Sequence, residues 1–400
     1  MEPASIAMQT VRHLAAGGRG SCTAEQRRAG AWAAEQLRAY GAQAVALEPF
    51  QGAPSTYRPF VAAFGLAALG SAAALAGAIT GSDNAAWALG LGALLNLLGA
   101  YTMFAESDFL PHPVNLLLPR APAHNVVGSI PAQGKARRRV VLCAHLDSHR
   151  TPVFYSSAGW QRVFGLLVSA TFLSMALGGL VLAPGVAPGL AWLGWIGVIL
   201  LPVQAFALLM MASADHTPFS PGANDDASGV GVILGLAARL QAEPLAQTDV
   251  RIAITDCEET GAWGMRAYLD RHAAELGSDA LYIILDEVGL DTIKFLRNDG
   301  LIRKHATHPR ALELLRRAAA ALPEIPTSEQ PGLAYTDALV ATRRGLAALT
   351  LCSVNAGGGA DSAAHWHQMS DTPEYVSAQA LENVHQFVWH LLKAQEQAGA

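Results

Sequence analysis

The chain has few charged residues, and it lacks the motifs typical of nucleic-acid-binding, thiol-based metal-binding and exported proteins. Asp, Glu, Lys and Arg make up 15% of its 400 residues, against about a quarter in an average soluble protein. It has no C-x-x-C pair and no basic patch interleaved with aromatic residues, and residues 1–50 contain no apolar core of the signal-peptide kind. We therefore expect no nucleic-acid partner, no thiol-based metal motif and no exported N-terminal segment.

The cysteines are too few for a disulfide framework in a chain of this length. There are four of them: Cys22, Cys143, Cys257 and Cys352. Three lie in apolar, strand-like runs, where a thiol usually behaves as a small buried hydrophobe. We expect reduced structural thiols.

The low share of charged residues is due largely to four runs that contain none. These are residues 60–81, 85–105, 163–183 and 190–212. Each approaches or exceeds the roughly 20 residues that a helix needs to cross a bilayer. Buried core helices are the alternative, but these are usually shorter and keep a polar face. The four runs form two pairs with short turns, which favours two transmembrane hairpins, at 60–105 and 163–212.

Two hairpins impose a topology on the rest of the chain. Each hairpin leaves and returns to the same side of the membrane, so residues 1–59, 106–162 and 213–400 share one compartment. The connecting turns carry no Lys or Arg, whereas the shared side carries Arg58, Arg120, Arg150 and Arg162 close to the runs. Because positive residues near spans favour the cytoplasm, we expect an integral protein of a bacterial inner membrane, with the lipid bilayer as a partner and the remaining sequence on the cytoplasmic side.

Outside the hairpins, strand and helix patterns alternate. Strands are expected at 43–48, 124–130, 139–145, 250–255, 280–286 and 347–352, and helices at 24–40, 230–241, 265–272, 309–321 and 377–395. Alternation of this kind predicts an α/β fold, with a mixed, mostly parallel sheet sandwiched by helices. The three segments 1–59, 106–162 and 213–400 would form this one discontinuous domain.

Polar residues stand at the ends of several expected strands. His145 ends one, Glu258 and Glu259 follow a second, and Asp286 ends a third. In such sheets, ligands bind beyond the carboxyl ends of the strands. Imidazole and carboxylate groups suit zinc, and a bridging carboxylate suits a pair of divalent ions. The strand ends therefore indicate a metal site.

Each motif also has an ordinary structural explanation when taken alone. A single histidine such as His145 is often structural, and the Gly222–Gly229 loop, GANDDASG, could serve as a helix cap. Glu258 and Glu259 could form a solvated acidic turn. After an apolar strand, the alternative is that one of these carboxylates binds a metal ion and the other transfers protons. The joint occurrence at strand ends favours the functional interpretation.

Five motifs occur in an order that resembles a known family. AHLDS, GANDDASG, CEETGAWG, ILDEVG and HQMSDT are similar to the motifs of the zinc aminopeptidases of clan MH, family 28, which include bacterial leucyl aminopeptidases. Residues 19–50 also resemble that family's opening helix and strand. The resemblance implies a zinc aminopeptidase/phosphorylase-hydrolase-like fold interrupted here by the two hairpins.

The resemblance implies a metal ligand for each motif. Asp225 would bridge two zinc ions, His145 and Asp286 would complete one site, and Glu259 and His367 would complete the other. His365 competes with His367 for its place, being two residues away. The cofactor expected is therefore a pair of Zn²⁺ ions.

The resemblance also implies roles away from the metal. Glu258 would be the general base, and Asp147, two residues after His145, would orient that imidazole. The peptide bond after Asp225 would be cis. Residues 335–338 resemble a substrate-pocket segment, in which Tyr335 and Asp337 would bind substrate.

The function expected is removal of N-terminal residues from peptide substrates by a membrane-anchored metallopeptidase. One alternative is a glutaminyl-cyclase-like acyltransferase, which shares the fold but uses one zinc. Another is a membrane scaffold or transporter with a degenerate peptidase domain. The full set of five ligand positions argues against the cyclase, and the presence of Glu258 argues against degeneracy.

Overall fold

The structure is a computed structural model that describes residues 2–81, 83–356 and 365–397. The chain divides into two compact units. The α/β unit comprises Met1–Pro54, Arg120–Thr151 and Pro218–Ala400, and the helical unit comprises Ser55–Pro119 and Pro152–Thr217. Each unit is therefore assembled from segments that are far apart in sequence.

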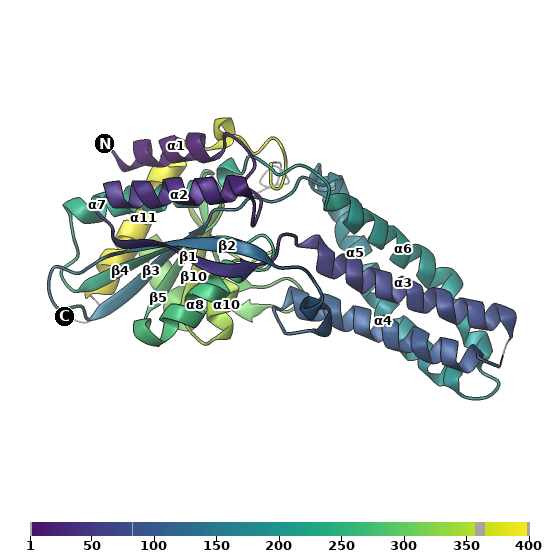
Figure 1. The fold of residues 1–400 in the computed structure, drawn as a ribbon. Helices are drawn as coiled ribbons and strands as arrows, with labels where there is room; N and C mark the ends of the chain where they lie inside the picture. The colour runs from purple at the N-terminus through teal and green to yellow at the C-terminus, as the bar shows by residue number, and fades with distance from the viewer. Residues whose placement is uncertain (1, 82, 357–364, 398–400) are drawn as a thin grey trace. The chain divides into compact units, whose positions relative to one another are not determined.

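An eight-stranded sheet runs through the α/β unit, in the order β1-β2-β4-β3-β5-β10-β6-β9 (Figure 1). The strands are β1 Gln43–Gly52, β2 Ala121–Ile130, β3 Arg138–His145, β4 Thr248–Thr255, β5 Leu281–Leu285, β6 Thr292–Leu296, β9 Thr327–Gln330 and β10 Ala347–Val354. The four central strands, β4, β3, β5 and β10, are parallel to one another. Antiparallel pairing occurs toward both edges, where β2 pairs with β4 and with β1, and β6 pairs with β10. The predicted mixed, mostly parallel sheet is confirmed.

Helices cover both faces of this sheet. Figure 1 shows α1, α2, α7 and α11 over one face and α8 and α10 over the other. Their bounds are α1 Pro3–Leu14, α2 Ala24–Ala39, α7 Ser228–Ala242, α8 Trp263–Leu276, α10 Asp337–Arg343 and α11 Ala378–Gln397, and α9 Pro309–Ala321 packs against α11. Because both faces are covered, central strands such as β5 and β10 are buried at every position and read as continuous apolar runs.

Local sequence explains where several of these helices begin. The Thr23 hydroxyl accepts a hydrogen bond from the Gln26 amide at 3.2 Å, which caps the start of α2. Pro309 occupies the first turn of α9, where its missing N–H has no helical partner to lose. These capping residues fix the helices that bury their apolar sides against the sheet.

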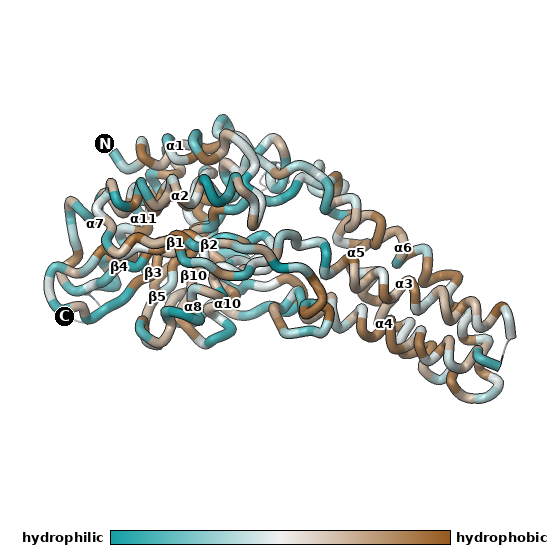
Figure 2. Tube along the Cα trace, in the orientation of Figure 1, coloured by the Kyte–Doolittle hydropathy of each residue, from teal (hydrophilic) through white to brown (hydrophobic). Residues whose placement is uncertain are grey.

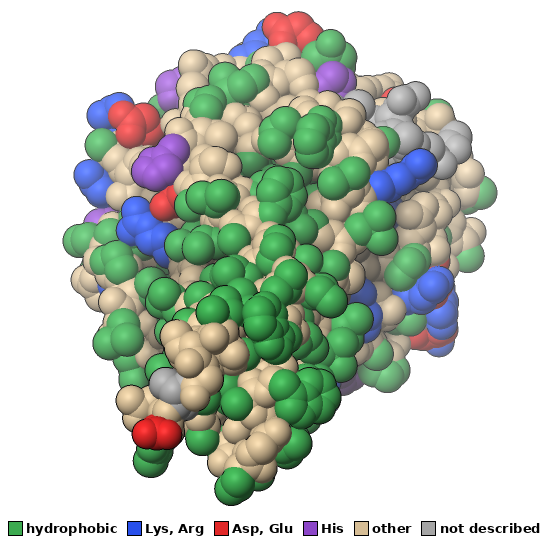
Figure 3. Space-filling view, turned by 90° about the vertical axis from the view of Figure 1, so that its right-hand side faces the viewer, with side chains coloured by type: hydrophobic (Ala, Val, Ile, Leu, Met, Phe, Trp, Pro, Cys, Tyr) green, Lys and Arg blue, Asp and Glu red, His purple; other side chains and the backbone are tan. Residues whose placement is uncertain are grey.

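Among the residues that the structure describes, the helical unit contains four helices long and apolar enough to cross a membrane, as judged from their length and composition. They are α3 Tyr57–Thr80, α4 Ala85–Ser107, α5 Ala158–Leu182 and α6 Gly197–Ala214, the last preceded by a 3₁₀ turn at Ala191–Ile196. The trace of these helices is dominated by hydrophobic residues (Figure 2), and Figure 3 shows hydrophobic side chains spread widely over the face in view. Large apolar residues such as Trp87 (81% exposed) and Leu166 (73% exposed) point outward, which is the reverse of a water-soluble bundle.

A polar cluster lies inside the helical unit. The Gln204 Nε2 amide donates to Asn96 Oδ1 at 2.8 Å, the Ser71 hydroxyl donates to Gln204 Oε1 at 2.8 Å, and the Asn96 Nδ2 amide donates to the Ser71 hydroxyl oxygen at 3.2 Å. All three side chains are fully buried. Because every member has a partner, the cluster stabilises the contact of α3, α4 and α6.

Candidate metal centre

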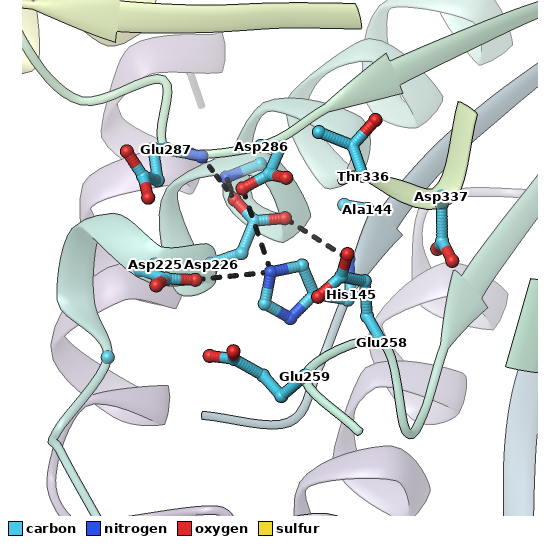
Figure 4. A network of polar contacts seen from close by, with 12 residues as sticks. Ala144, His145, Asp225, Asp226, Glu258, Glu259, Asp286, Glu287, Thr336 and Asp337 are labelled. Atoms are coloured by element: carbon cyan, nitrogen blue, oxygen red, sulfur yellow. Dashed lines mark hydrogen bonds and ion pairs between the residues drawn. The ribbon is translucent and has the colours of Figure 1, made fainter. Parts of the chain in front are cut away.

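The carboxyl ends of the parallel strands bring four of the expected site residues to one edge of the sheet. His145 is the last residue of β3, Glu258 and Glu259 follow β4, and Asp286 follows β5. Since β4, β3 and β5 are parallel neighbours, these residues emerge side by side (Figure 4). The arrangement follows from strand order, which sequence alone does not state.

One group of ligand atoms forms around His145. His145 Nε2 lies 3.1 Å from Asp225 Oδ1 and 3.7 Å from Asp286 Oδ1. The ligand atoms of these three residues all lie within 4.8 Å of one another, and all three residues are buried. This is a donor set of one imidazole and two carboxylates, which suits zinc.

A second group forms around His367. His367 Nε2 lies 3.1 Å from Asp225 Oδ2 and 3.4 Å from Glu259 Oε2. The ligand atoms of His367, Glu259 and His149 also lie within 4.8 Å of one another. Asp225 therefore offers one carboxylate oxygen to each group, which is the placement that a bridging ligand requires.

His149 belongs to the second group although no motif in the sequence predicts it. Its Nδ1 lies 2.7 Å from the Arg150 carbonyl oxygen, to which Nδ1–H donates. Its ring stacks on that of His367 with 3.7 Å between centroids. The one feature of the sequence that could have indicated His149 is its position four residues after His145. Because it lies in an irregular loop, that spacing does not predict where its side chain points.

The backbone around Asp225 is held by two other aspartates. Asp371 accepts hydrogen bonds from the amides of Asn224 at 2.8 Å and Asp225 at 3.1 Å. Asp226 accepts from the amides of His145 at 3.1 Å, Gly229 at 3.0 Å and Glu287 at 3.2 Å. The peptide bond between Asp225 and Asp226 is cis, as the resemblance implies. Asp226 thus joins the Asp225 turn to the ends of β3 and β5.

Asp147 contacts both the first imidazole and the turn that carries the two glutamates. Its carbonyl oxygen accepts from His145 Nδ1 at 3.0 Å, while its carboxylate lies 3.6 Å from the same nitrogen. The carboxylate accepts instead from the amides of Glu258 and Glu259, both at 3.2 Å, and from the Ser21 hydroxyl at 2.6 Å. Asp147 therefore holds the position of the Glu258–Glu259 turn as well as the His145 ring.

Glu258 lies beside the ligand atoms without belonging to either group. It is buried, and its Oε1 has no hydrogen-bond partner among the residues that the structure describes. Burial raises the pKa of its carboxyl well above the usual range, and the negative charges of Asp286, Asp337 and Glu259 raise it further. A carboxyl with a raised pKa and a free oxygen is suited to accept and release a proton.

The electrostatics of the ligand groups favour a cation. Burial raises the pKa of Glu259 to about 7, and the charge of Asp225 adds to the shift. Burial alone would lower the pKa of His367, but Glu259 and Asp225 raise it to about 10. The carboxylates of Asp147, Asp225 and Asp286 likewise outweigh burial and raise the pKa of His145. Such a concentration of buried negative charge is what a divalent ion neutralises.

The other expected residues lie near the centre or beneath it. The Tyr335 hydroxyl donates to the Glu259 carbonyl oxygen at 3.3 Å. Asp337 is buried and accepts from the Thr255 hydroxyl at 2.6 Å, at the start of α10. His365 lies outside both ligand groups: its Nδ1 is 2.9 Å from the Ser370 hydroxyl, and its ring stacks on Tyr375. Of the two competing histidines, the structure brings His367 to the ligands.

Comparison with known proteins gives a family match to part of the chain and a set of similar folds. Residues 199–392 match the model of "Peptidase family M28", a segment that contains Asp225, Glu258, Glu259, Asp286 and His367. The chain is 38% identical over 79 residues to aminopeptidase YwaD of Bacillus subtilis, a match that covers 20% of this chain and 17% of that protein. The chain thus matches under a fifth of the length of this relative.

Among solved structures, similarity extends over nearly the whole chain at low identity. A glutaminyl cyclase from Porphyromonas gingivalis has a TM-score of 0.57 at 17% identity and 98% coverage of both chains. A zinc-dependent exopeptidase from Parabacteroides distasonis has 0.55 at 16% identity and 98% of both chains. A zinc aminopeptidase from Bacillus subtilis has 0.57 at 14% identity, over 98% of this chain and 95% of that one. The family model thus matches a little under half of the chain, and the similarity to solved structures at this identity shows a shared fold.

Proposed function

We propose that the chain is a membrane-anchored, two-zinc aminopeptidase. The observation that carries the proposal is the position of Asp225, which offers one carboxylate oxygen to each of two buried ligand groups. His145 and Asp286 would hold one zinc ion with Asp225, and Glu259 and His367 would hold the other. Bound zinc ions polarise a peptide carbonyl and generate hydroxide from water near neutral pH.

The chain's own residues supply the proton transfers. Glu258 would take the proton of the attacking water on its free Oε1 and deliver it to the leaving amine nitrogen. Asp147 would keep that carboxyl in place through the amides of Glu258 and Glu259. Tyr335, whose hydroxyl bonds the Glu259 carbonyl oxygen, would contact the substrate next to the second ligand group. Asp337 would support this substrate-pocket segment from its buried side, because the Asp337 side chain is itself buried.

The proposal extends to the arrangement of the chain in the membrane. Residues 60–105 and 163–212 would form two transmembrane hairpins inserted into one discontinuous peptidase domain made of residues 1–59, 106–162 and 213–400. Support comes from the length and composition of the four helices and from their outward apolar side chains. The peptidase domain would lie on the cytoplasmic side.

The test combines metal analysis with catalysis on the full chain purified in detergent. We expect two equivalents of zinc and release of the N-terminal residue from aminoacyl substrates. Glu258→Gln should retain both ions while kcat falls by about 10²- to 10⁴-fold, because it removes proton transfer alone. Glu374→Gln, at an exposed glutamate outside both ligand groups, is the matched control. Unchanged hydrolysis by Glu258→Gln, or a purified protein without metal, would refute the proposal.

A glutaminyl cyclase is the second candidate, because such enzymes share the fold at a TM-score of 0.57. The presence of two ligand groups argues for the peptidase. A peptide with N-terminal glutamine separates the two activities, since a cyclase releases ammonia and leaves a pyroglutamyl peptide, whereas an aminopeptidase releases free glutamine. Metal-free protein with neither activity would support the scaffold interpretation.

A further inference from the structure

Two cysteines that are distant in the sequence meet beside the metal centre. Cys22 lies in the turn before α2, and Cys257 lies between the end of β4 and Glu258. Their Sγ atoms are 3.3 Å apart, and both thiols are free. Since a disulfide bond is about 2.05 Å long, the two sulfur atoms need to approach by roughly 1.3 Å. From the sequence alone, both are expected to be reduced structural thiols.

The surrounding backbone leaves room for this pair. Gly52, at the end of β1, faces both sulfur atoms: a Cβ added there would lie 2.5 Å from Cys257 Sγ and 3.0 Å from Cys22 Sγ. Any larger residue would push the two thiols aside. Both cysteines also adopt left-handed backbone conformations, with φ of 63° and 59°, which non-glycine residues rarely adopt except where the surroundings impose them.

The segments that carry the two cysteines already bind the same carboxylate. Ser21, next to Cys22, donates its hydroxyl to Asp147 at 2.6 Å. Glu258, next to Cys257, donates its amide to Asp147 at 3.2 Å. A bond between the two cysteines would therefore fasten together the two segments that meet at Asp147, one of which carries the proposed general base.

We propose that Cys22 and Cys257 are a site of intramolecular disulfide formation when the protein meets a small-molecule disulfide such as oxidised glutathione. Cys22, which is half-buried, attacks one sulfur of the oxidant as its thiolate and releases one small thiol. The Cys257 sulfur then attacks Cys22 Sγ in the mixed disulfide and releases the second, its proton passing to the leaving thiolate. Two protein S–H bonds and one S–S bond of the oxidant are consumed, and one protein S–S bond and two small thiols are formed.

The order of these steps follows from accessibility. Cys22 is half-buried, whereas Cys257 is fully buried. Cys257 is therefore a poor partner for reagents in solution, but it needs no access to solvent to react with a sulfur atom already in contact. Cys143 and Cys352 are also buried, and neither shares a sulfur contact with another cysteine in the part of the chain that the structure describes.

The experiment measures the bond directly and needs no enzyme activity, so its result is independent of the proposed function. The full chain in detergent is treated with oxidised glutathione, denatured, alkylated, and digested without reduction. Mass spectrometry should find the Cys22 peptide joined to the Cys257 peptide, and dithiothreitol should separate them. Cys22→Ser should abolish the joined peptide, and the matched control Cys352→Ala should retain it.

Three results would overturn the proposal. Cys22 and Cys257 could both be recovered alkylated after treatment, or Cys22 could be recovered as a stable mixed disulfide with glutathione. Cys22 could also be joined to Cys143, to Cys352 or to a second copy of the chain. Cys257→Ala provides an independent check, because it should convert the Cys22 product from the internal disulfide to the mixed disulfide.

Discussion

His149 has the hydrogen bonding of a metal-binding histidine. In such residues one ring nitrogen commonly donates to a carbonyl or carboxylate and leaves the other for the ion, and His149 Nδ1 bonds the Arg150 carbonyl oxygen. Its ligand atom lies within 4.8 Å of those of Glu259 and His367, and its ring stacks on His367. In the proposed two-zinc centre, His149 would either bind the ion of the second ligand group or hold the His367 ring in place.

His149→Ala is accordingly expected to weaken the binding of one zinc ion about 10- to 100-fold while the other stays bound. The measurement is zinc content after dialysis against graded concentrations of a chelator. His365→Ala is the matched control, since His365 lies in the same region but outside both ligand groups. Equal zinc affinity in His149→Ala and wild type would show that His149 takes no part in ion binding.

At this scale, strand patterns predicted the residues that follow strands, the family motifs added Asp225 and His367 in loops, and His149 was missed. His145, Glu258, Glu259 and Asp286 stand directly after apolar strands, so parallel pairing brings them together whatever the loops do. His149 lies in an irregular loop, and its direction depends on contacts made far along the chain. The pairing of Cys22 with Cys257 could not be predicted either, because it depends on tertiary contacts that bring the two loops together.

Strands in the middle of the sheet were predicted more completely than those at the β6–β9 edge. The strands β3, β4, β5 and β10 carry apolar runs because both faces are covered. The strands β6 and β9 were not predicted; the half-buried TSEQ of β9 has no apolar residue, and its pairing with β6 is set by the fold. Helix α1 was also not predicted. The run 190–212 begins as a 3₁₀ turn rather than an α-helix, so its regular part, α6, starts at Gly197.

Helices α3 and α4 approach so closely that glycine is required between them. A Cβ added to Gly92 would lie 2.7 Å from the Gly70 carbonyl oxygen and 3.0 Å from Ala74 Cβ. Gly92→Val should therefore force the helices apart and cost about 1–3 kcal/mol, seen as a lower midpoint of thermal unfolding in detergent. Gly165→Val is the control, because nothing lies within 4 Å of the added Cβ. Equal midpoints for the two variants would contradict close packing at Gly92.

Helix α11 buries a histidine in its neutral form. Neither ring nitrogen of His385 has a hydrogen-bond partner among the described residues. Burial lowers its pKa from 6.5 to about 4, and the charge of Arg239 adds to the shift. The unfolded chain then binds this proton more readily than the folded one, so the stability that neutral His385 contributes is complete above pH 6.5 and is lost as the pH falls toward 4.

From this shift we expect the free energy of unfolding to fall by up to about 3 kcal/mol between pH 6.5 and 4 on account of His385. His385→Leu should remove this part of the pH dependence, which is read from thermal midpoints measured across the range. His390→Leu, on the same helix at a half-buried position, should leave it unchanged. A pH profile that is the same in His385→Leu and wild type would show that the buried ring does not control it.

At the scale of the whole molecule, the two proposed hairpins would determine which parts of the chain share a compartment. If both cross the membrane, the turns near Asp83 and Pro188 lie on one side, and residues 1–59, 106–162 and 213–400 lie on the other. The positive-inside rule would then put those three segments in the cytoplasm, because Arg58, Arg120, Arg150 and Arg162 flank the proposed spans while the turns carry no Lys or Arg.

Single cysteines labelled in intact cells with a membrane-impermeant maleimide test this topology, in a Cys22→Ser background that removes the half-buried native thiol. We expect Asp83→Cys and Pro188→Cys to react and Glu382→Cys to react only after the membrane is permeabilised. The opposite pattern would reverse the orientation while keeping the hairpins. Labelling of all three sites in intact cells, or release of the chain by alkaline carbonate, would mean that the four helices do not span the bilayer. A cytoplasmic result would also place Cys22 and Cys257 in a reducing compartment, where the pair stays as thiols until an oxidant reaches it.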